Sequence, residues 1–455
     1  MQAYDTKNSS WKRFSPDQRK AVHEYGERYK VFLDTARTER LAATNIIRNA
    51  EAAGFKPLDE YKKLVPGDKV YWNQKGKSVI LAVIGDEAIC EGLRIVGAHI
   101  DSPRLDLKAN PVYEKNGLVY FKTHYYGGIR KYQWVCIPLS LIGVVCTTDG
   151  RTVEINIGDD LQDPVLYITD LLPHLGKEQD EKKLANAIEG EMLMPLIGSN
   201  SEEDTIKPAI LAILKEKYGI VEEDFASAEL EVVPAQKSRD VGLDRSMIAA
   251  YGHDDRVCAY ANLEAILKAR PVHKMQAALF SDKEEIGSVG NTGVQTPYFV
   301  DFLAECLALQ ETKDDLTLRR TLRKSEVLSA DVTVAYDPNF ASVYEETNTA
   351  RLGYGIGLCK YTGARGKAGS NDANAEFLGK VRRIFNENNI PWQIGELGKI
   401  DQGGGGTIAY IMAKWGCEVV DCGVAMLSMH SPLELVSKTD AYTAYLAYKA
   451  FFESK

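Results

Sequence analysis

Five segments of the chain place histidine or acidic residues directly after an apolar run, where a strand would end. These segments are residues 96–101, 253–255, 280–285, 329–331 and 427–430. In an open α/β sheet, ligands bind outside the carboxyl ends of the strands. We therefore expect the five segments, which spread over more than 330 positions, to meet in one crevice.

The chemistry of these side chains is that of a metal-dependent hydrolase. Imidazole and carboxylate ligands suit Zn²⁺, and a catalytic zinc site keeps one position open for water. Two metals about 3.5–4 Å apart can clamp the attacking and departing oxygens of a hydrolysis. The ligands available for such a pair are His99, Asp254, Glu285, Asp331 and His430. One carboxylate, Glu284, is left over, and a carboxylate beside a water bound to metal is a natural general base.

Each of these residues also has an ordinary structural interpretation when it is taken alone. A strand-end histidine followed by an aspartate, as in His99 and Asp101, commonly serves only the fold. An acidic pair such as Glu284 and Glu285 is commonly solvated, and an isolated aspartate suits a helix cap or a turn. The joint occurrence of all five placements, with the right mixture of ligands, favours the metal site.

The elements that must position these residues alternate between strand and helix. An N-terminal helix is expected after the capping-box pattern Ser15-Pro16-Asp17-Gln18. Later helices are expected at residues 256–267, 297–309, 372–388 and 407–414, between strands at 275–280, 327–330, 392–397 and 418–421. Such alternation predicts an α/β fold with a mostly parallel central sheet that is flanked by helices.

A β-rich stretch interrupts this alternation. Asn116-Gly117 between two apolar runs predicts a hairpin. Further strands are expected at residues 133–146, 152–157 and 229–233, and helices at 184–193 and 206–218. The simplest arrangement is one α/β domain, residues 1–104 and 244–455, with a β-rich domain inserted at 105–243.

Composition excludes several other classes of protein. Of the 455 residues, 45% are hydrophobic and 26% are charged, which is typical of a globular protein. The formal charge of −9 and the absence of a dense basic run argue against a nucleic-acid partner. The longest apolar stretch, residues 134–146, is shorter than the ~20 residues of a membrane span. Eight scattered cysteines and no visible signal peptide predict a cytoplasmic protein with reduced thiols.

The motifs together resemble the aminopeptidase I and aspartyl aminopeptidase family of cocatalytic zinc peptidases. They are His-Ile-Asp-Ser-Pro-Arg at 99–104, Asp-Asp-Arg-Val-Cys at 254–258, Asp-Lys-Glu-Glu-Ile-Gly-Ser at 282–288, Ala-Asp-Val at 330–332 and Ser-Met-His-Ser at 428–431. The resemblance covers nearly the whole chain, in the right order. It implies a catalytic α/β domain, an inserted β-rich dimerisation domain and a homo-oligomer, namely a tetrahedral dodecamer whose active sites face an inner chamber.

The resemblance also implies a role for each residue. Asp254 looks like the ligand that bridges the metals, although Asp255 stands where relatives often have asparagine and leaves the choice between the two open. His99 and Asp331 would complete one zinc site, and Glu285 and His430 the other. Glu284 would be the general base, and Asp101 would orient the imidazole of His99.

A further stretch, residues 166–175, resembles one that contributes a substrate-side histidine from a neighbouring subunit. Either His174 or Asp170 occupies the equivalent place. This ambiguity leaves the preferred N-terminal residue open among acidic, neutral and large apolar types.

We therefore predict a dinuclear zinc aminopeptidase that acts on peptides with a free N-terminus. Glu284 would take a proton from the attacking water and give it to the departing amine. Co²⁺ or Mn²⁺ would also suit the ligands. Alternatives are a cocatalytic deacylase or carboxypeptidase and, outside the enzymes, a catalytically idle carrier or scaffold.

Overall fold

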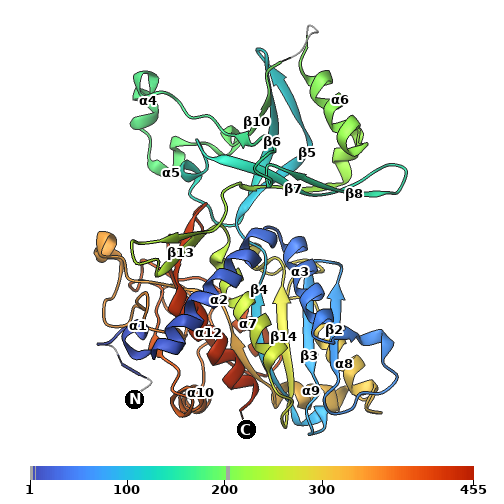
Figure 1. Cartoon of the computed structure of the whole chain (residues 1–455), viewed down its shortest axis with the longest axis vertical. Coiled ribbons are helices and arrows are strands. Elements are labelled where there is room, and N and C mark those ends of the chain that lie inside the picture. The colour runs from blue at the N-terminus through green and yellow to red at the C-terminus, as the bar shows by residue number, and fades with distance from the viewer. Residues whose placement is uncertain (1–3, 6, 201–204, 455) are drawn as a thin grey trace. The chain divides into compact units, whose positions relative to one another are not determined.

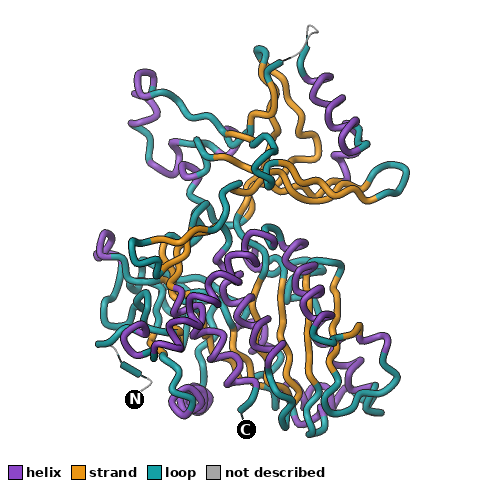
Figure 2. Tube along the Cα trace, in the orientation of Figure 1, coloured by secondary structure: helices purple, strands orange, loops and turns teal. Residues whose placement is uncertain are grey.

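The computed structural model describes residues 4–5, 7–200 and 205–454, and the contacts between its residues define two compact units. The first unit comprises residues 1–101, 238–429 and 434–455, and the second comprises residues 102–237 and 430–433. Figure 1 colours the chain from its N-terminus to its C-terminus, and Figure 2 distinguishes the helices, strands and loops of each unit.

A mixed sheet of nine strands, counted over the described residues, forms the centre of the first unit. In spatial order the strands are β1 (Lys56–Pro57), β2 (Lys69–Gln74), β3 (Ser78–Val83), β14 (Met275–Ser281), β4 (Leu93–His99), β15 (Glu326–Ser329), β19 (Glu418–Gly423), β17 (Ile356–Cys359) and β18 (Trp392–Ile394). Strands β14, β4, β15 and β19 are parallel to one another.

The prediction of a mostly parallel sheet is confirmed in part: these four central strands are parallel, as are the outer pairs β1–β2 and β17–β18, but other pairs are antiparallel. Strands β3 and β17 run antiparallel to their inner neighbours β14 and β19. Strand β3 also pairs with β2 in the antiparallel sense through a tight turn, because a short connection cannot return a chain to a parallel start. The fold is thus α/β with a mixed sheet whose four central strands are parallel.

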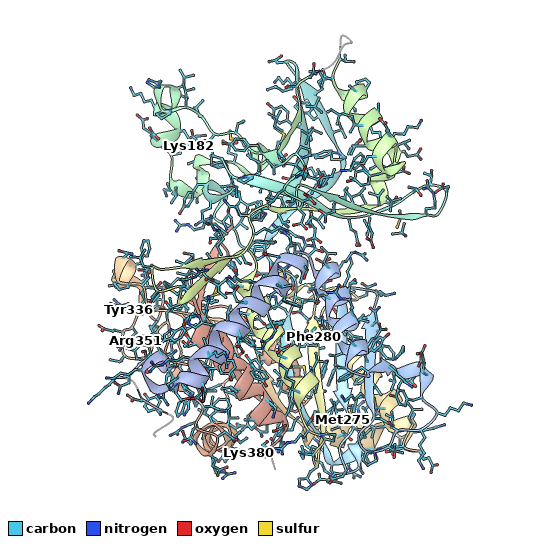
Figure 3. All side chains as sticks on the ribbon, viewed as in Figure 1. Lys182, Met275, Phe280, Tyr336, Arg351 and Lys380 are labelled. Atoms are coloured by element: carbon cyan, nitrogen blue, oxygen red, sulfur yellow. The ribbon has the colours of Figure 1, made fainter. Side chains whose placement is uncertain are left out.

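Helices cover both faces of this sheet, as the alternation in the sequence predicted. One face packs against α3 (Glu39–Ala52), α7 (His253–Lys268), α10 (Ala375–Glu387) and α12 (Lys438–Phe452), and α2 (Pro16–Thr35) packs against α7 and α12. The other face packs against α8 (Tyr298–Ala308), α9 (Asp315–Arg323) and α11 (Ala409–Lys414). Side chains of β14 alternate between the two cores: Phe280 belongs to the first and Met275 to the second (Figure 3).

The N-terminal helix α2 begins as predicted. The hydroxyl of Ser15 accepts the backbone N–H of Gln18, and the side chain of Gln18 accepts the N–H of Ser15. Tyr25, Tyr29 and Phe32 then recur on one face and are buried. A short helix, α1 (Ser10–Arg13), precedes α2.

The first unit also contains a smaller sheet, and one of its strands, β13, directly precedes α7 in the sequence. Its strands, in order, are β12 (Arg239–Val241), β13 (Met247–Ala250), β21 (Glu434–Ser437), β20 (Ala425–Leu427) and β16 (Thr333–Val334). Strands β13 and β21 pair antiparallel, with Ile248 opposite Val436. This sheet therefore supports the turn that leads from β13 into α7.

The second unit is built on antiparallel strands. They are β5 (Arg104–Lys115), β6 (Leu118–Tyr126), β7 (Pro138–Cys146), β8 (Thr152–Ile157), β9 (Leu166–Tyr167), β10 (Leu196–Gly198) and β11 (Ala228–Pro234). Strand β11 pairs with both β5 and β7. Asn116 and Gly117 form the predicted hairpin turn, and both have positive φ angles, 50° and 76°.

The helices of the second unit differ in part from the prediction. Helix α6 (Lys207–Tyr218) forms and ends at Gly219, whose φ of 70° is typical of a helix C-terminus. Residues 184–193 do not form one helix, because Ile188 is extended and separates α5 (Leu184–Ala187) from a 3₁₀ turn at Gly190–Met192. A further short helix is α4 (Lys177–Asp180). Among the described residues, every helix is too short or too polar to span a bilayer.

Candidate active site

The carboxyl ends of β14, β4 and β15 meet at one edge of the central sheet, because these neighbouring strands are parallel. Ser281 pairs with His99, and Ser329 pairs with Gly97. His99 is the last residue of β4, and Asp331 follows β15 by two residues. Glu284 and Glu285 form a single 3₁₀ turn after β14. The fold of the first unit thus gathers three of the predicted segments at this edge.

The side chains at this edge form overlapping groups with the composition of metal ligands. His99 Nε2 lies 3.1 Å from Asp254 Oδ1 and 3.8 Å from Asp331 Oδ1. Three sets of donor atoms each lie within 4.8 Å of one another: His99, Asp254 and Glu285; His99, Glu284 and Asp331; and Asp254, Asp255 and Asp331. The structure therefore brings together five of the predicted residues, with His99 common to two of the sets.

Asp254 and Asp255 make different contacts at the start of α7. The carboxylate of Asp254 faces the imidazole of His99, and its backbone N–H donates to Glu434 Oε2 at 3.0 Å. The carboxylate of Asp255 instead accepts the backbone N–H of His99 through Oδ2 at 3.2 Å. Asp254 is thus the one that faces the imidazole, while Asp255 holds the end of β4.

Asp101 ties two parts of the site together. Its Oδ1 and Oδ2 accept the backbone N–H groups of Glu284 and Glu285 at 3.1 and 3.2 Å. His99 Nδ1 lies 3.2 Å from the same Oδ1 and 3.1 Å from the backbone carbonyl oxygen of Asp101. Asp101 is fully buried, so its carboxylate orients both the imidazole of His99 and the turn that carries the two glutamates.

Burial, together with the crowding of like charges, raises the pKa of acids in this cluster. Burial raises the pKa of Asp331 well above its ordinary value, and the nearby carboxylates of Asp255, Glu284 and Asp254 raise it further against the opposing effect of His99. Burial alone would lower the pKa of His99, but its hydrogen bonds with Asp101 and Asp254 raise it. Several carboxylates around one imidazole fit a divalent cation, which would neutralise their charge, and the donor set of nitrogen and oxygen fits zinc.

His430 belongs to the second unit, with residues 430–433. Its Nδ1 donates a hydrogen bond to the carbonyl oxygen of Gly128 at 2.8 Å, since a carbonyl oxygen can only accept. A metal bound by His430 would therefore use Nε2. The meeting of His430 with the cluster of the first unit stays a prediction.

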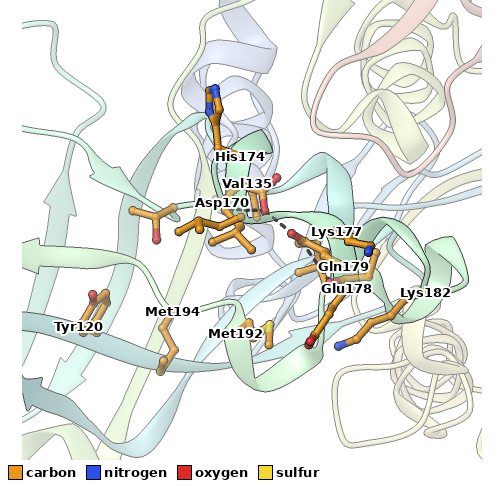
Figure 4. Close-up of a pocket in the computed structure, with 15 residues that line it drawn as sticks. Tyr120, Val135, Asp170, His174, Lys177, Glu178, Gln179, Lys182, Met192 and Met194 are labelled. Atoms are coloured by element: carbon orange, nitrogen blue, oxygen red, sulfur yellow. Dashed lines mark hydrogen bonds between the residues drawn. The ribbon is translucent and has the colours of Figure 1, made fainter.

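A separate hollow of about 740 Å³ lies within the second unit (Figure 4). Asp170 and His174 both line it, and Asp170 Oδ1 accepts a hydrogen bond from the side chain of Gln179 at 3.1 Å. The choice between His174 and Asp170 as the residue that reaches a neighbouring subunit's substrate stays open.

Sequence reasoning missed two residues that hold Asp254 in place. Glu434 is buried and accepts the N–H of Asp254. The sequence signal that could have found it is an acidic residue at a buried position of strand β21. Tyr29 donates to the imidazole of His253, the residue before Asp254. No local pattern links Tyr29 to that segment, because 224 positions separate the two residues.

The family of the chain follows from comparison with known proteins. A family model described as "Aminopeptidase I zinc metalloprotease (M18)" matches residues 32–452. The chain belongs to the M18 family. A curated relative, "Probable M18 family aminopeptidase 1" of Clostridium acetobutylicum, is 48% identical over 455 residues that cover 98% of each chain. The relative of the same name from Thermotoga maritima is 46% identical over 437 residues, covering 95% of this chain and 96% of the relative.

Solved structures of M18 members show the same fold. The crystal structure of an M18 family aminopeptidase from Thermotoga maritima matches with a TM-score of 0.95 at 44% identity, covering 99% of this chain and all of that one. Aminopeptidase I from Clostridium acetobutylicum matches with a TM-score of 0.93 at 45% identity, over 99% of this chain and 100% of that one.

Membership in M18 confirms the family resemblance and the predicted class of enzyme. The chain is an aminopeptidase, a zinc metalloprotease that hydrolyses peptide bonds at the N-terminus of its substrate. The family supports neither the deacylase and carboxypeptidase alternatives nor the idle scaffold.

Proposed function

We propose that this M18 aminopeptidase works with two zinc ions per subunit, held by His99, Asp254, Glu285, Asp331 and His430. The observation that carries the proposal is the pair of donor sets that share Asp254, each within 4.8 Å. One set contains His99 and Glu285, and the other contains Asp255 and Asp331. Two overlapping sets offer places for two neighbouring ions, where one isolated set would offer a place for one.

In this proposal Asp254 bridges the two ions. Its carboxylate faces His99 Nε2, while one oxygen of Asp255, Oδ2, accepts the backbone N–H of His99. His99 and Asp331 complete one zinc site, and Glu285 and His430 complete the other. Co²⁺ or Mn²⁺ would suit the same oxygen and nitrogen donors.

Glu284 is the general base of the proposed mechanism. Bound zinc would polarise the first peptide carbonyl as a Lewis acid and make water a stronger nucleophile. Glu284 accepts the proton that the attacking water loses, and it then donates this proton to the departing amine. Asp101 accepts the N–H of Glu284 and also faces His99. One buried carboxylate therefore fixes the position of the base relative to the metal ligand His99.

The substrate is a peptide with a free N-terminus, and the partner is further copies of the same chain. We extend the proposal to the tetrahedral dodecamer that the family resemblance implies, with residues 105–243 as the dimerisation domain inserted between residues 1–104 and 244–455. The antiparallel strands of the second unit support a β-rich domain in that part of the chain.

Two measurements on the purified protein test this proposal. Mass spectrometry of metal-loaded protein is expected to find two zinc ions per chain. A panel of aminoacyl chromogenic substrates is expected to be hydrolysed with a free amino group and to resist hydrolysis once that group is acetylated. One zinc per chain would remove the dinuclear centre, and cleavage of the acetylated compounds would remove the free-amine requirement.

A further inference from the structure

A buried chain of hydrogen bonds runs through His253, the residue directly before Asp254. The hydroxyl of Tyr29 lies 2.8 Å from His253 Nδ1, and His253 Nε2 lies 3.1 Å from the carbonyl oxygen of Ile248. Tyr29, His253 and Ile248 are each 0% exposed. The imidazole of His253 therefore interacts with both partners out of contact with solvent.

The chemistry of these atoms fixes the direction of both hydrogen bonds. The carbonyl oxygen of Ile248 can only accept, so His253 Nε2–H donates to it. Nδ1 of the same neutral ring then carries no proton and accepts the O–H of Tyr29. Because both ring nitrogens are engaged in this way, His253 serves the fold of the segment that it opens.

The partners of His253 belong to elements that are themselves well anchored. Tyr29 is on α2, which packs against α7, and its ring stacks on Tyr260 of α7 with a centroid distance of 5.3 Å. Ile248 is on β13, which pairs with β21. The imidazole thus ties the turn between β13 and α7 to a helix on one side and to a strand on the other.

Asp254 directly follows His253, so these hydrogen bonds also restrain the position of Asp254. Its own N–H donates to Glu434 on β21, and its carboxylate faces His99. The turn that carries Asp254 is therefore held by the side chain of the preceding residue and by its own backbone. A ligand shared by two ions has to satisfy both at once, so small errors in this turn would affect both.

We propose that Tyr29 and His253 are positioning residues that orient the carboxylate of Asp254 toward the metals. This inference rests on the proposed function, in which Asp254 is the bridging ligand. Neither residue touches the substrate or a metal, and both act through the turn between β13 and α7. Loss of the hydrogen bond between them would leave Asp254 present but less well directed.

Helix α2 provides a matched pair of variants for the test. Tyr25 and Tyr29 lie one turn apart, are both 0% exposed and both contact Tyr260 at a centroid distance of 5.3 Å. Within the described part of the chain, the hydroxyl of Tyr25 has no hydrogen-bond partner, whereas that of Tyr29 donates to His253. Tyr29→Phe and Tyr25→Phe therefore remove the same atom from the same helix, and only the first removes the hydrogen bond to His253.

The experiment measures zinc retention against a competing chelator, the visible absorption spectrum of the Co²⁺-substituted protein, and kcat and KM. Tyr29→Phe is expected to weaken zinc binding about tenfold, as is usual when a group behind a metal ligand is lost. It is also expected to alter the Co²⁺ spectrum and to lower kcat with KM little changed. Tyr25→Phe is expected to match the wild type in all three. Equal behaviour of the two variants would overturn the proposal.

A second variant keeps the proposal testable if Tyr29→Phe fails to fold. His253→Gln retains an amide N–H that can reach the carbonyl of Ile248 but lacks an acceptor at the Nδ1 position. It is expected to weaken zinc binding as much as Tyr29→Phe, and wild-type affinity in His253→Gln would overturn the proposal. A wild-type protein that binds fewer than two zinc ions would instead contradict the proposed function, so the two failures are distinguishable.

Discussion

The two edges of the central sheet carry buried charges that are neutralised in different ways. At the amino edge, Arg94 of β4 pairs with Glu326 of β15, and Lys380 Nζ lies 2.9 Å from the other oxygen of that glutamate. At the carboxyl edge of the same strands, His99 is surrounded by acids, including Asp254 and Asp331. One edge contains its own counter-charges, and the other has an excess of acid that fits a bound cation.

This contrast teaches which buried charges belong to the fold and which to the chemistry. An ion pair such as Arg94 with Glu326 is complete within the chain, so its removal should affect the stability of the protein. A cluster of like charges costs stability and remains useful only when a ligand completes it.

The largest difference in kcat is expected when one glutamate at each edge is replaced by glutamine. Glu284→Gln removes the proposed base and is expected to lower kcat about 10³-fold while two zinc ions stay bound. Glu326→Gln, the matched change at the amino edge, is expected to leave kcat per folded molecule unchanged. Steady-state kinetics and metal analysis of both variants check this, and near-normal turnover in Glu284→Gln would mean that another group is the base.

Loss of Arg94 is expected to act on stability alone. Arg94→Met leaves the carboxylate of Glu326 with one cation in place of two in a largely buried site, and we expect a loss of about 3 kcal/mol in the free energy of unfolding. Urea denaturation measures this loss, and zinc content and kcat of the folded fraction serve as controls. A stable Arg94→Met variant with impaired catalysis would contradict the division between the edges.

Asp101→Asn is expected to have a smaller effect, confined to the carboxyl edge. The amide nitrogen of asparagine cannot accept the N–H of Glu284 or Glu285, so one of the two hydrogen bonds that fix the turn is lost. We expect zinc affinity to fall by about 10-fold to 100-fold, in line with other residues that support metal ligands. Chelator competition measures this change, and unchanged affinity would show that Asp101 does not direct the ligands.

Asp440 is a further buried acid, and a proton can neutralise it. Its two oxygens accept the N–H groups of Gly355 and Gly353 at 2.8 and 2.6 Å, yet burial raises its pKa from 3.8 to about 7. Between these values the native state holds a proton that the unfolded state has lost, so stability falls as pH rises from about 4 to about 7. One proton corresponds to at most about 1.4 kcal/mol per pH unit.

Comparison of the wild type with Asp440→Asn isolates this contribution. The difference between their unfolding free energies is expected to favour the wild type progressively less as pH rises through this window. A difference that does not vary with pH would show that Asp440 ionises alike in the folded and unfolded states.

Much of the site could be predicted from the sequence because its ligands follow strands directly. His99, Asp331 and the pair at 284–285 each come within a few residues of a strand end, and parallel pairing carries those ends to one edge. The antiparallel course of β3 and β17 could not be predicted in this way, because strand direction in a sheet depends on tertiary pairing as well as on composition.

The residues that support Asp254 could not be predicted from local sequence patterns, because they too depend on tertiary contacts. Tyr29 and Glu434 reach the turn at Asp254 from positions more than 170 residues away on either side of it in the chain. For residues 184–193 the prediction of one helix was wrong. Their apolar spacing suits a helix, but the chain is extended at Ile188 and turns again at Gly190.

The most direct test of the dinuclear centre is X-ray diffraction from crystals of the zinc-loaded protein, with anomalous data collected on both sides of the zinc absorption edge. We expect two anomalous peaks per chain, within about 4 Å of each other, contacting His99, Asp254, Glu285, Asp331 and His430. A single peak, or peaks that leave Asp254 or His430 without contact to metal, would contradict the proposed centre.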